Sequence, residues 1–158
     1  VLEKLQSFSA ERPVFVESES KKIGLLQIPD ALIETMRASP CMRLTCATDV
    51  RIALLQEEYA HFLDNPDGLK YQLERLRGLH PGERLTRWQT LCSSRSWDTL
   101  VGELLEYHYD PAYLKSIRNH YPGYDRASEL TLNSLNTGDF HALAQEVLAL
   151  SGDFVNNR

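Results

Sequence analysis

The sequence of 158 residues lacks the features that would place a protein in or across a membrane. No apolar run approaches the roughly 20 residues that a membrane-spanning helix needs. The first ten residues also lack the charged and then apolar order of a signal peptide. We therefore expect a soluble cytoplasmic protein that does not interact with a membrane.

Cysteine is scarce as well, with only Cys41, Cys46 and Cys92. The number is odd, and no histidine or second cysteine stands at a metal-ligand spacing from any of the three. This pattern predicts reduced thiols and no zinc site. No Ser-His-Asp arrangement is visible either. Because the chain starts at Val1, we expect it to be a processed or truncated piece.

Positive charge is in the minority, since 17 Lys and Arg face 22 Asp and Glu and the net charge is -5. This argues against a protein coated uniformly in positive charge for nucleic acid. Residues 69–96 are the exception, because six basic residues against two acidic ones give them a local charge of +4. Such a block can clamp phosphates or meet an RNA backbone, and it can equally be a solvated helix face. The six basic residues are Lys70, Arg75, Arg77, Arg84, Arg87 and Arg95.

Apolar residues with strand or helix spacing predict the order strand, helix, strand, helical block, strand and helix. The strands are expected at residues 13–16, 41–46 and around 130–132. Long crossovers between strands are typical of a parallel sheet covered by helices. We therefore predict an α/β fold, a partial P-loop NTPase-like parallel sheet of about three strands with a large helical block at about residues 48–118. A mostly helical protein with minor strands is the competing interpretation.

The first expected strand, Val14-Phe15-Val16, ends directly in Glu17. This is the form of the second nucleotide-binding motif of P-loop proteins, in which an apolar strand delivers a carboxylate to the sheet edge where ligands bind. The polar stretch that follows adds carboxylates that can orient water or Mg²⁺ and lysines that can neutralise phosphate. A solvated strand end is the alternative. The companion motif G-x-x-x-x-G-K-[ST] is absent from the sequence, so this chain cannot cradle a triphosphate by itself.

A second polar cluster lies at residues 108–113, which contain His108, Tyr109, Asp110 and Tyr113. Such a loop can hold a base or a phosphate, whereas Asp110-Pro111 is also an ordinary helix start. We expect residues 108–111 to end the helical block and a short helical piece to follow at 113–117. The remaining histidines, at positions 61, 80, 120 and 141, have no matching partner spacing. The tryptophans, at positions 88 and 97, fall on apolar stripes that are expected in the core.

Residues 12–24, with the sequence RPVFVESESKKIG, resemble the bacterial tRNA 2-selenouridine synthase family. Residues 29–36, the helix expected at 51–62 and the stretch LLEYHYDPAY at 104–113 are similar to the same family, and the resemblance runs from about Leu2 to Leu150. It implies a rhodanese-like domain with a catalytic cysteine followed by a P-loop domain, of which residues 1–158 are the carboxyl-terminal portion. The rhodanese-like domain and the Walker A phosphate-binding loop are therefore expected upstream of Val1. None of the three cysteines present takes the role of the catalytic thiol.

The resemblance also implies a function, the replacement of sulfur by selenium in 2-thiouridine at the wobble position of tRNA. Selenophosphate is the implied selenium donor, and the family is also associated with S-geranylation of the same base from geranyl diphosphate. Both compounds are substrates of the parent enzyme, whereas this chain alone is expected to bind no cofactor or metal and to be inactive. Its expected partners are the tRNA and the rhodanese-like domain. The site residues that follow from the resemblance are Glu17 and Glu19 as catalytic groups, and Ser20, Lys21, Arg84, Arg87, Tyr109, Asp110 and Tyr113 as substrate- or phosphate-binding groups.

Two other functions stay open. The chain can be half of a kinase-like P-loop phosphotransferase, which would transfer a phosphoryl group from ATP to a small acceptor. It can also be a non-catalytic helical module that binds RNA through the basic block at residues 69–96.

Overall fold

The computed structural model describes residues 2–9, 11–18 and 21–156, and the chain divides into two compact units. Unit 1 contains residues 1–45, 115–132 and 136–158, and unit 2 contains residues 46–114 and 133–135. Among the described residues no helix is long and apolar enough to cross a membrane.

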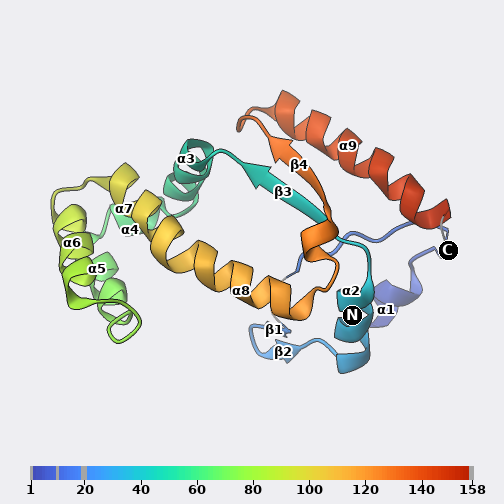
Figure 1. The fold of residues 1–158 in the computed structure, drawn as a ribbon, viewed down its shortest axis with the longest axis horizontal. Helices are drawn as coiled ribbons and strands as arrows, with labels where there is room; N and C mark the ends of the chain where they lie inside the picture. The colour runs from blue at the N-terminus through green and yellow to red at the C-terminus, as the bar shows by residue number, and fades with distance from the viewer. Residues whose placement is uncertain (1, 10, 19–20, 157–158) are drawn as a thin grey trace. The chain divides into compact units, whose positions relative to one another are not determined.

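A small parallel sheet organises unit 1. Strands β3 (Met42–Cys46) and β4 (Ser128–Leu132) lie side by side and point the same way (Figure 1). The Thr45 hydroxyl lies 3.1 Å from that of Thr131, and an Arg43–Glu129 ion pair joins the same strands. In β4 the side chains of Leu130 and Leu132 are buried and those between and before them are exposed, which is the alternation of a half-buried strand.

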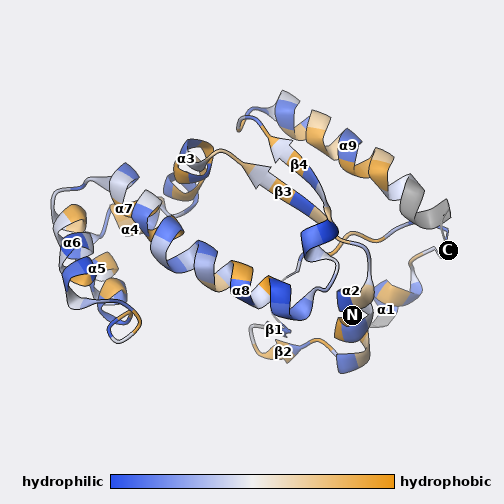
Figure 2. Cartoon of the chain, viewed as in Figure 1, coloured by the Kyte–Doolittle hydropathy of each residue, from blue (hydrophilic) through white to orange (hydrophobic). Residues whose placement is uncertain are grey.

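Helices flank this sheet. Helix α9 (Thr137–Asn156) packs against β4, and hydrophobic and hydrophilic residues alternate along it, as in a helix with one packed side (Figure 2). Helix α2 (Asp30–Ala38) follows Pro29 and buries Ile33. The remaining elements of unit 1 are α1 (Leu2–Gln6), the antiparallel hairpin of β1 (Lys22–Ile23) and β2 (Leu26–Gln27), the second part of α8 (Asp110–His120) and η2 (Tyr124–Arg126).

The strand expected at residues 13–16 is not formed, and this prediction is wrong. Val14, Phe15 and Val16 are irregular in backbone and 47%, 51% and 64% exposed. A strand is stable only when a neighbour satisfies its backbone hydrogen bonds, and no described segment pairs with these residues. The predicted fold class is confirmed as a mostly helical α/β structure, with two parallel strands in place of about three.

Unit 2 is helical. Its elements are α3 (Thr48–Glu58), α4 (Ala60–Leu63), α5 (Pro66–Glu74), α6 (Gly82–Ser93), α7 (Trp97–Leu104), η1 (Leu105–Tyr109) and the first part of α8. Trp88 is fully buried, and Trp97 packs against the same core, as the apolar stripes predict. The core also contains Leu73, Leu85, Cys92 and Leu100. Burial raises the pKa of the Cys92 thiol, so this cysteine is a packing residue.

The expected end of the helical block at residues 108–111 is also wrong. The π-helical turn η1 joins α7 to α8 without a break, and the Asp110 N–H bonds to the carbonyl of Leu105, five residues back. Pro111 follows directly after this π-turn and has no N–H to donate to it. Such π-turns are frequent at functional sites, and this one lies at the centre of the polar cluster.

Candidate functional site

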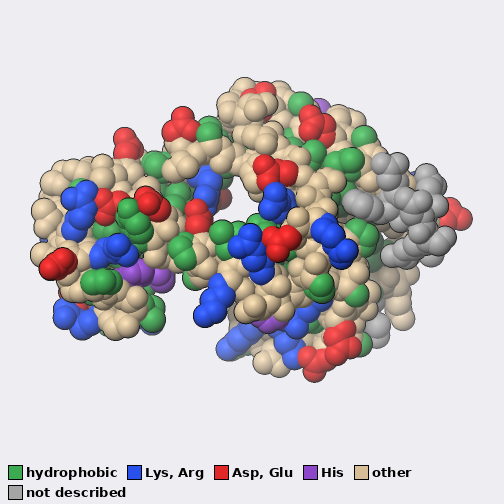
Figure 3. Space-filling view, in the orientation of Figure 1, with side chains coloured by type: hydrophobic (Ala, Val, Ile, Leu, Met, Phe, Trp, Pro, Cys, Tyr) green, Lys and Arg blue, Asp and Glu red, His purple; other side chains and the backbone are tan. Residues whose placement is uncertain are grey.

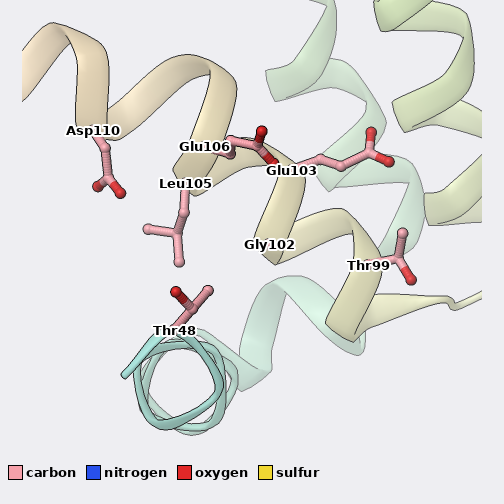
Figure 4. A pocket seen from close by; sticks show the side chains of 7 residues that line it. All are labelled: Thr48, Thr99, Gly102, Glu103, Leu105, Glu106 and Asp110. Carbon is pink, nitrogen blue, oxygen red and sulfur yellow. The ribbon is translucent and has the colours of Figure 1, made fainter. Parts of the chain in front are cut away.

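A cavity of about 410 Å³ opens in unit 2 between α3, α7, η1 and the first turn of α8. Figure 4 shows the side chains of Thr48, Leu105 and Asp110 converging on the same space. Its lining residues are Thr48, Thr99, Gly102, Glu103, Leu105, Glu106 and Asp110. Apart from Gly102 and Leu105, all are oxygen-bearing side chains, so the cavity is rich in hydrogen-bond acceptors.

Three carboxylates reach this cavity because Glu103, Glu106 and Asp110 are spaced three and four residues apart along a continuous helical segment. Glu103 is the most constrained of them, with only 16% of its side chain exposed. It accepts hydrogen bonds from Arg87 Nε at 2.7 Å and from Trp88 Nε1 at 3.1 Å. The buried indole therefore orients this carboxylate from the core side.

Asp110 is held by Arg51 from the first part of α3. The guanidinium donates to both carboxylate oxygens, at 2.8 and 2.6 Å, which is the bidentate geometry of a strong Arg–carboxylate pair. Hydrogen bonding to Asp110 is the main reason that the pKa of Arg51 is raised. Both side chains are about one-third exposed, so this pair ties α3 to α8 at the rim of the cavity.

Two tyrosines lie next to this ion pair in the sequence. The rings of Tyr109 and Tyr113 are 6.0 Å apart at their centroids and tilted by only 8°. They are 55% and 41% exposed, so the pair lies at the surface rather than in the core. A stacked, exposed aromatic pair is a surface on which a planar base can lie.

A cluster of rings and cations occupies another part of unit 2. His80 Nε2 lies 3.0 Å from His108 Nδ1, and the His80 ring packs edge-on against Trp88. Burial, followed by the proximity of His108 and of Arg84, lowers the pKa of His80. The guanidinium of Arg84 lies over the ring of Tyr107, 4.1 Å from its centroid.

Three of the six cations of the basic block are neutralised by carboxylates of unit 2. Ion pairs join Arg77 to Glu74 and Arg87 to Glu103, and a longer one of 3.5 Å joins Lys70 to Asp67. On the face of unit 2 in Figure 3, Lys and Arg side chains are interspersed with Asp and Glu. The local charge of +4 therefore does not form a continuous basic surface on this face.

The predicted site residues fall into three groups. Arg84, Arg87, Tyr109, Asp110 and Tyr113 all belong to unit 2, where Asp110 lines the cavity and Arg87 holds the Glu103 carboxylate. In unit 1, the side chain of Glu17 is exposed and Lys21 forms an ion pair with Asp30. The predicted catalytic Glu19 and phosphate-binding Ser20 lie outside the described residues.

Several residues of the site were missed by sequence reasoning. The helical spacing of Glu103, Glu106 and Asp110 was a usable signal, because it places three carboxylates on adjoining turns. The Arg51–Asp110 pair and the His80–His108 pair left no such signal, since their members are 59 and 28 residues apart. His80, for which the sequence shows no matching partner spacing, contacts His108 and packs against Trp88.

The chemistry of the cavity is that of an acceptor site. The side chains that line the cavity are rich in oxygen acceptors and include no Lys or Arg, so the cavity suits ligand groups that donate hydrogen bonds, such as hydroxyl and N–H groups. Within residues 2–9, 11–18 and 21–156, no three His, Cys, Asp or Glu side chains gather in a way that would hold a metal ion.

Comparison with known proteins identifies the family. Residues 1–79 match the family model of the AAA domain of tRNA 2-selenouridine synthase. This match contains residues 12–24, on which the resemblance seen in the sequence depends, and it ends before the basic residues of α6. No curated protein and no solved structure matches the chain. Since the matched residues make up half of its length, the chain belongs to the tRNA 2-selenouridine synthase AAA domain family.

Proposed function

We propose that this chain is the carboxyl-terminal part of the P-loop domain of an enzyme that replaces sulfur by selenium in wobble 2-thiouridine of tRNA. The observation that carries this proposal is the family match over residues 1–79. It makes tRNA the substrate class of the parent enzyme. The selenium donor in this proposal is selenophosphate.

We propose further that the exchange proceeds through S-geranylation of the base. The thiocarbonyl sulfur attacks the first carbon of geranyl diphosphate, a carbon–sulfur bond forms and diphosphate leaves. Cations and N–H donors that stabilise the departing diphosphate would accelerate this step. The alkylated sulfur is then a better leaving group than the original thiocarbonyl. The selenium of selenophosphate attacks the ring carbon, the carbon–sulfur bond to the ring breaks and geranyl thiol leaves with a proton; water then cleaves the selenium–phosphorus bond and releases phosphate.

The candidate residues form two groups, one that would bind phosphate groups and one that would bind the nucleoside. Phosphate groups require cations, and Lys21 and Arg84 are the candidates for these, together with Ser20 beside the proposed catalytic carboxylates Glu17 and Glu19. The nucleoside requires acceptors and apolar faces. The cavity at Asp110 and the stacked rings of Tyr109 and Tyr113 supply both, and Arg87 positions Glu103 at the cavity.

The chain by itself is proposed to be inactive and to hold no cofactor. It contains no G-x-x-x-x-G-K-[ST] loop, which would bind the phosphates of a nucleotide or diphosphate. In this proposal the loop and the reactive thiol of a rhodanese-like domain come from other parts of the parent enzyme.

The test uses the full-length parent protein with 2-thiouridine tRNA, selenophosphate and geranyl diphosphate, followed by mass analysis of the nucleosides. We expect 2-selenouridine, and a geranylated nucleoside when selenophosphate is left out. ATP-dependent phosphorylation of a small acceptor without either product would favour the phosphotransferase. Retention of tRNA with no change in its nucleosides would favour the RNA-binding module.

A further inference from the structure

Arg84 differs from the other basic residues of unit 2 whose contacts are described above. Arg77 and Arg87 each form an ion pair with a carboxylate. No carboxylate of the described residues pairs with Arg84, and its guanidinium carbon instead lies over the ring of Tyr107, 4.1 Å from the ring centroid. Its positive charge is therefore held in place but not neutralised by an anion.

The surroundings explain how this stack is held. Arg84 stands in the first turn of α6, and Tyr107 stands in the π-turn η1. The residue after Tyr107 is His108, which is anchored through its 3.0 Å contact to His80, and His80 is packed on the fully buried Trp88. The platform therefore rests on the core of unit 2.

Arg84 lies over one face of the Tyr107 ring, and the neighbouring carboxylates Glu103 and Glu106 contact other groups. The side chain of Glu106 is hydrogen-bonded to that of Tyr107, which is the first cause of the raised pKa of this phenol. That carboxylate is thus placed at the hydroxyl edge of the ring, whereas Arg84 covers a ring face. Glu103 is occupied by Arg87 and Trp88.

A guanidinium held on an aromatic ring can make two kinds of contact with RNA. Its N–H edge can donate to phosphate oxygens, and the plane of the guanidinium can stack on an unpaired base. The cavity lined by Glu103, Glu106 and Asp110 does not offer the first contact, because no Lys or Arg is among its lining residues.

We infer that the Arg84–Tyr107 stack is a contact surface for an unpaired nucleotide of the tRNA, with Arg84 on the phosphate or base and Tyr107 as its support. This inference rests on the proposed function, which makes tRNA the substrate. It goes further by assigning the contact to one arginine of the basic block and excluding the acidic cavity from phosphate binding.

The experiment measures binding of fluorescent 2-thiouridine tRNA to the full-length parent protein over a series of salt concentrations. In Arg84→Ala we expect binding to weaken by about tenfold and the slope of log K against log salt to fall by about one phosphate contact. Arg84→Lys keeps the charge and should keep the slope, but it should lose affinity because an ammonium does not stack as a guanidinium does. Tyr107→Leu should weaken binding with the slope nearly unchanged.

The matched control is Arg77→Ala, which removes the same charge from an arginine already paired with Glu74. It should bind tRNA within about twofold of the wild type, and thermal unfolding should confirm that every variant is folded. Wild-type affinity in folded Arg84→Ala, or an equal loss in Arg77→Ala, would overturn the inference. A wild type that binds tRNA through Arg84 but makes no selenonucleoside would refute the proposed function and leave the inference standing. A wild type that does not bind tRNA would refute both.

Discussion

At the scale of single residues, the site is defined by which charges have partners. Glu103 and Asp110 line the cavity, and each carboxylate is held by an arginine, so their positions do not depend on a ligand. Arg84 has an aromatic support in place of a counter-ion. The held carboxylates can accept hydrogen bonds from hydroxyl groups, and Arg84 on its ring can bind phosphate. Together they suit a ligand that has both hydroxyl and phosphate groups.

Replacing Glu103 should weaken unit 2 through its effect on Trp88. In Glu103→Ala the buried indole N–H loses its acceptor, and we expect the free energy of unfolding to fall by about 1–3 kcal/mol. Glu103→Gln keeps an acceptor oxygen and should cost less. Urea unfolding followed by tryptophan fluorescence measures both, and equal losses for the two variants would contradict this role.

Stability should depend on pH through His80. Its pKa in the folded chain lies below the ordinary value of 6.5, so the unfolded chain binds the proton more tightly. The contribution is therefore fully present above about pH 6.5 and is lost as the pH falls toward the lower folded value. Denaturant unfolding between about pH 7 and 5 should show this decline, and His80→Gln should reduce it. The exposed His61 provides the control substitution His61→Gln, which should leave the decline unchanged.

Glu17 is the residue of unit 1 on which the catalytic proposal depends. We expect Glu17→Ala to lower turnover of the full-length parent by about tenfold or more, because a carboxylate that orients water or a proton contributes at least this much. The control is Glu11→Ala, which removes another exposed carboxylate of the same segment. Formation of 2-selenouridine at the wild-type rate in a folded Glu17→Ala enzyme would remove Glu17 from the site.

At the scale of elements, the π-turn and the close approach of α3 and α7 shape the cavity. The π-turn buries Leu105 at the cavity and leaves Glu106 and Tyr107 exposed. Gly102 allows α7 to approach α3, because a Cβ at this position would lie 3.3 Å from Ile52 Cδ1. Both features use local backbone geometry to bring residues of separate helices to one place.

A branched side chain at Gly102 should therefore separate these helices. We expect Gly102→Val to lower the free energy of unfolding by about 1–3 kcal/mol through overpacking against Ile52. Gly82→Val is the matched control, since nothing lies within 4 Å of a Cβ at Gly82. Combining Gly102→Val with Ile52→Ala should recover part of the loss. If the two single glycine variants lost equal stability, packing between α3 and α7 would not be the cause.

At the scale of the whole molecule, activity is expected to require more than these 158 residues. The purified chain incubated with thiolated tRNA, selenophosphate and geranyl diphosphate should yield neither a geranylated nor a selenium-containing nucleoside, because it lacks a phosphate-binding loop. The full-length parent should yield the selenium-containing nucleoside under the same conditions and the geranylated one when selenophosphate is left out. Mass analysis of the digested tRNA detects both nucleosides, and either product from the chain alone would contradict the expectation.

The sequence by itself determined the features that depend on local patterns. Periodic apolar residues predicted the helices α2, α6 and α9, strands β3 and β4 and the burial of Trp88, because amphipathic spacing is a property of each segment alone. The motif at residues 12–24 identified the family for a similar reason, since its residues are contiguous.

Tertiary structure alone decided the pairings between distant residues. The segment at 13–16 has strand composition but no described neighbour, and backbone pairing cannot be read from one segment. Arg51 contacts Asp110, and His80 contacts His108, only because their helices pack together. The π-turn also sets the direction of the chain at His108 and just before Asp110. Packing decides which residues become electrostatic and hydrogen-bonding partners when they are far apart in the sequence. The acidic cavity and the Arg84–Tyr107 stack could therefore be found only in the folded chain.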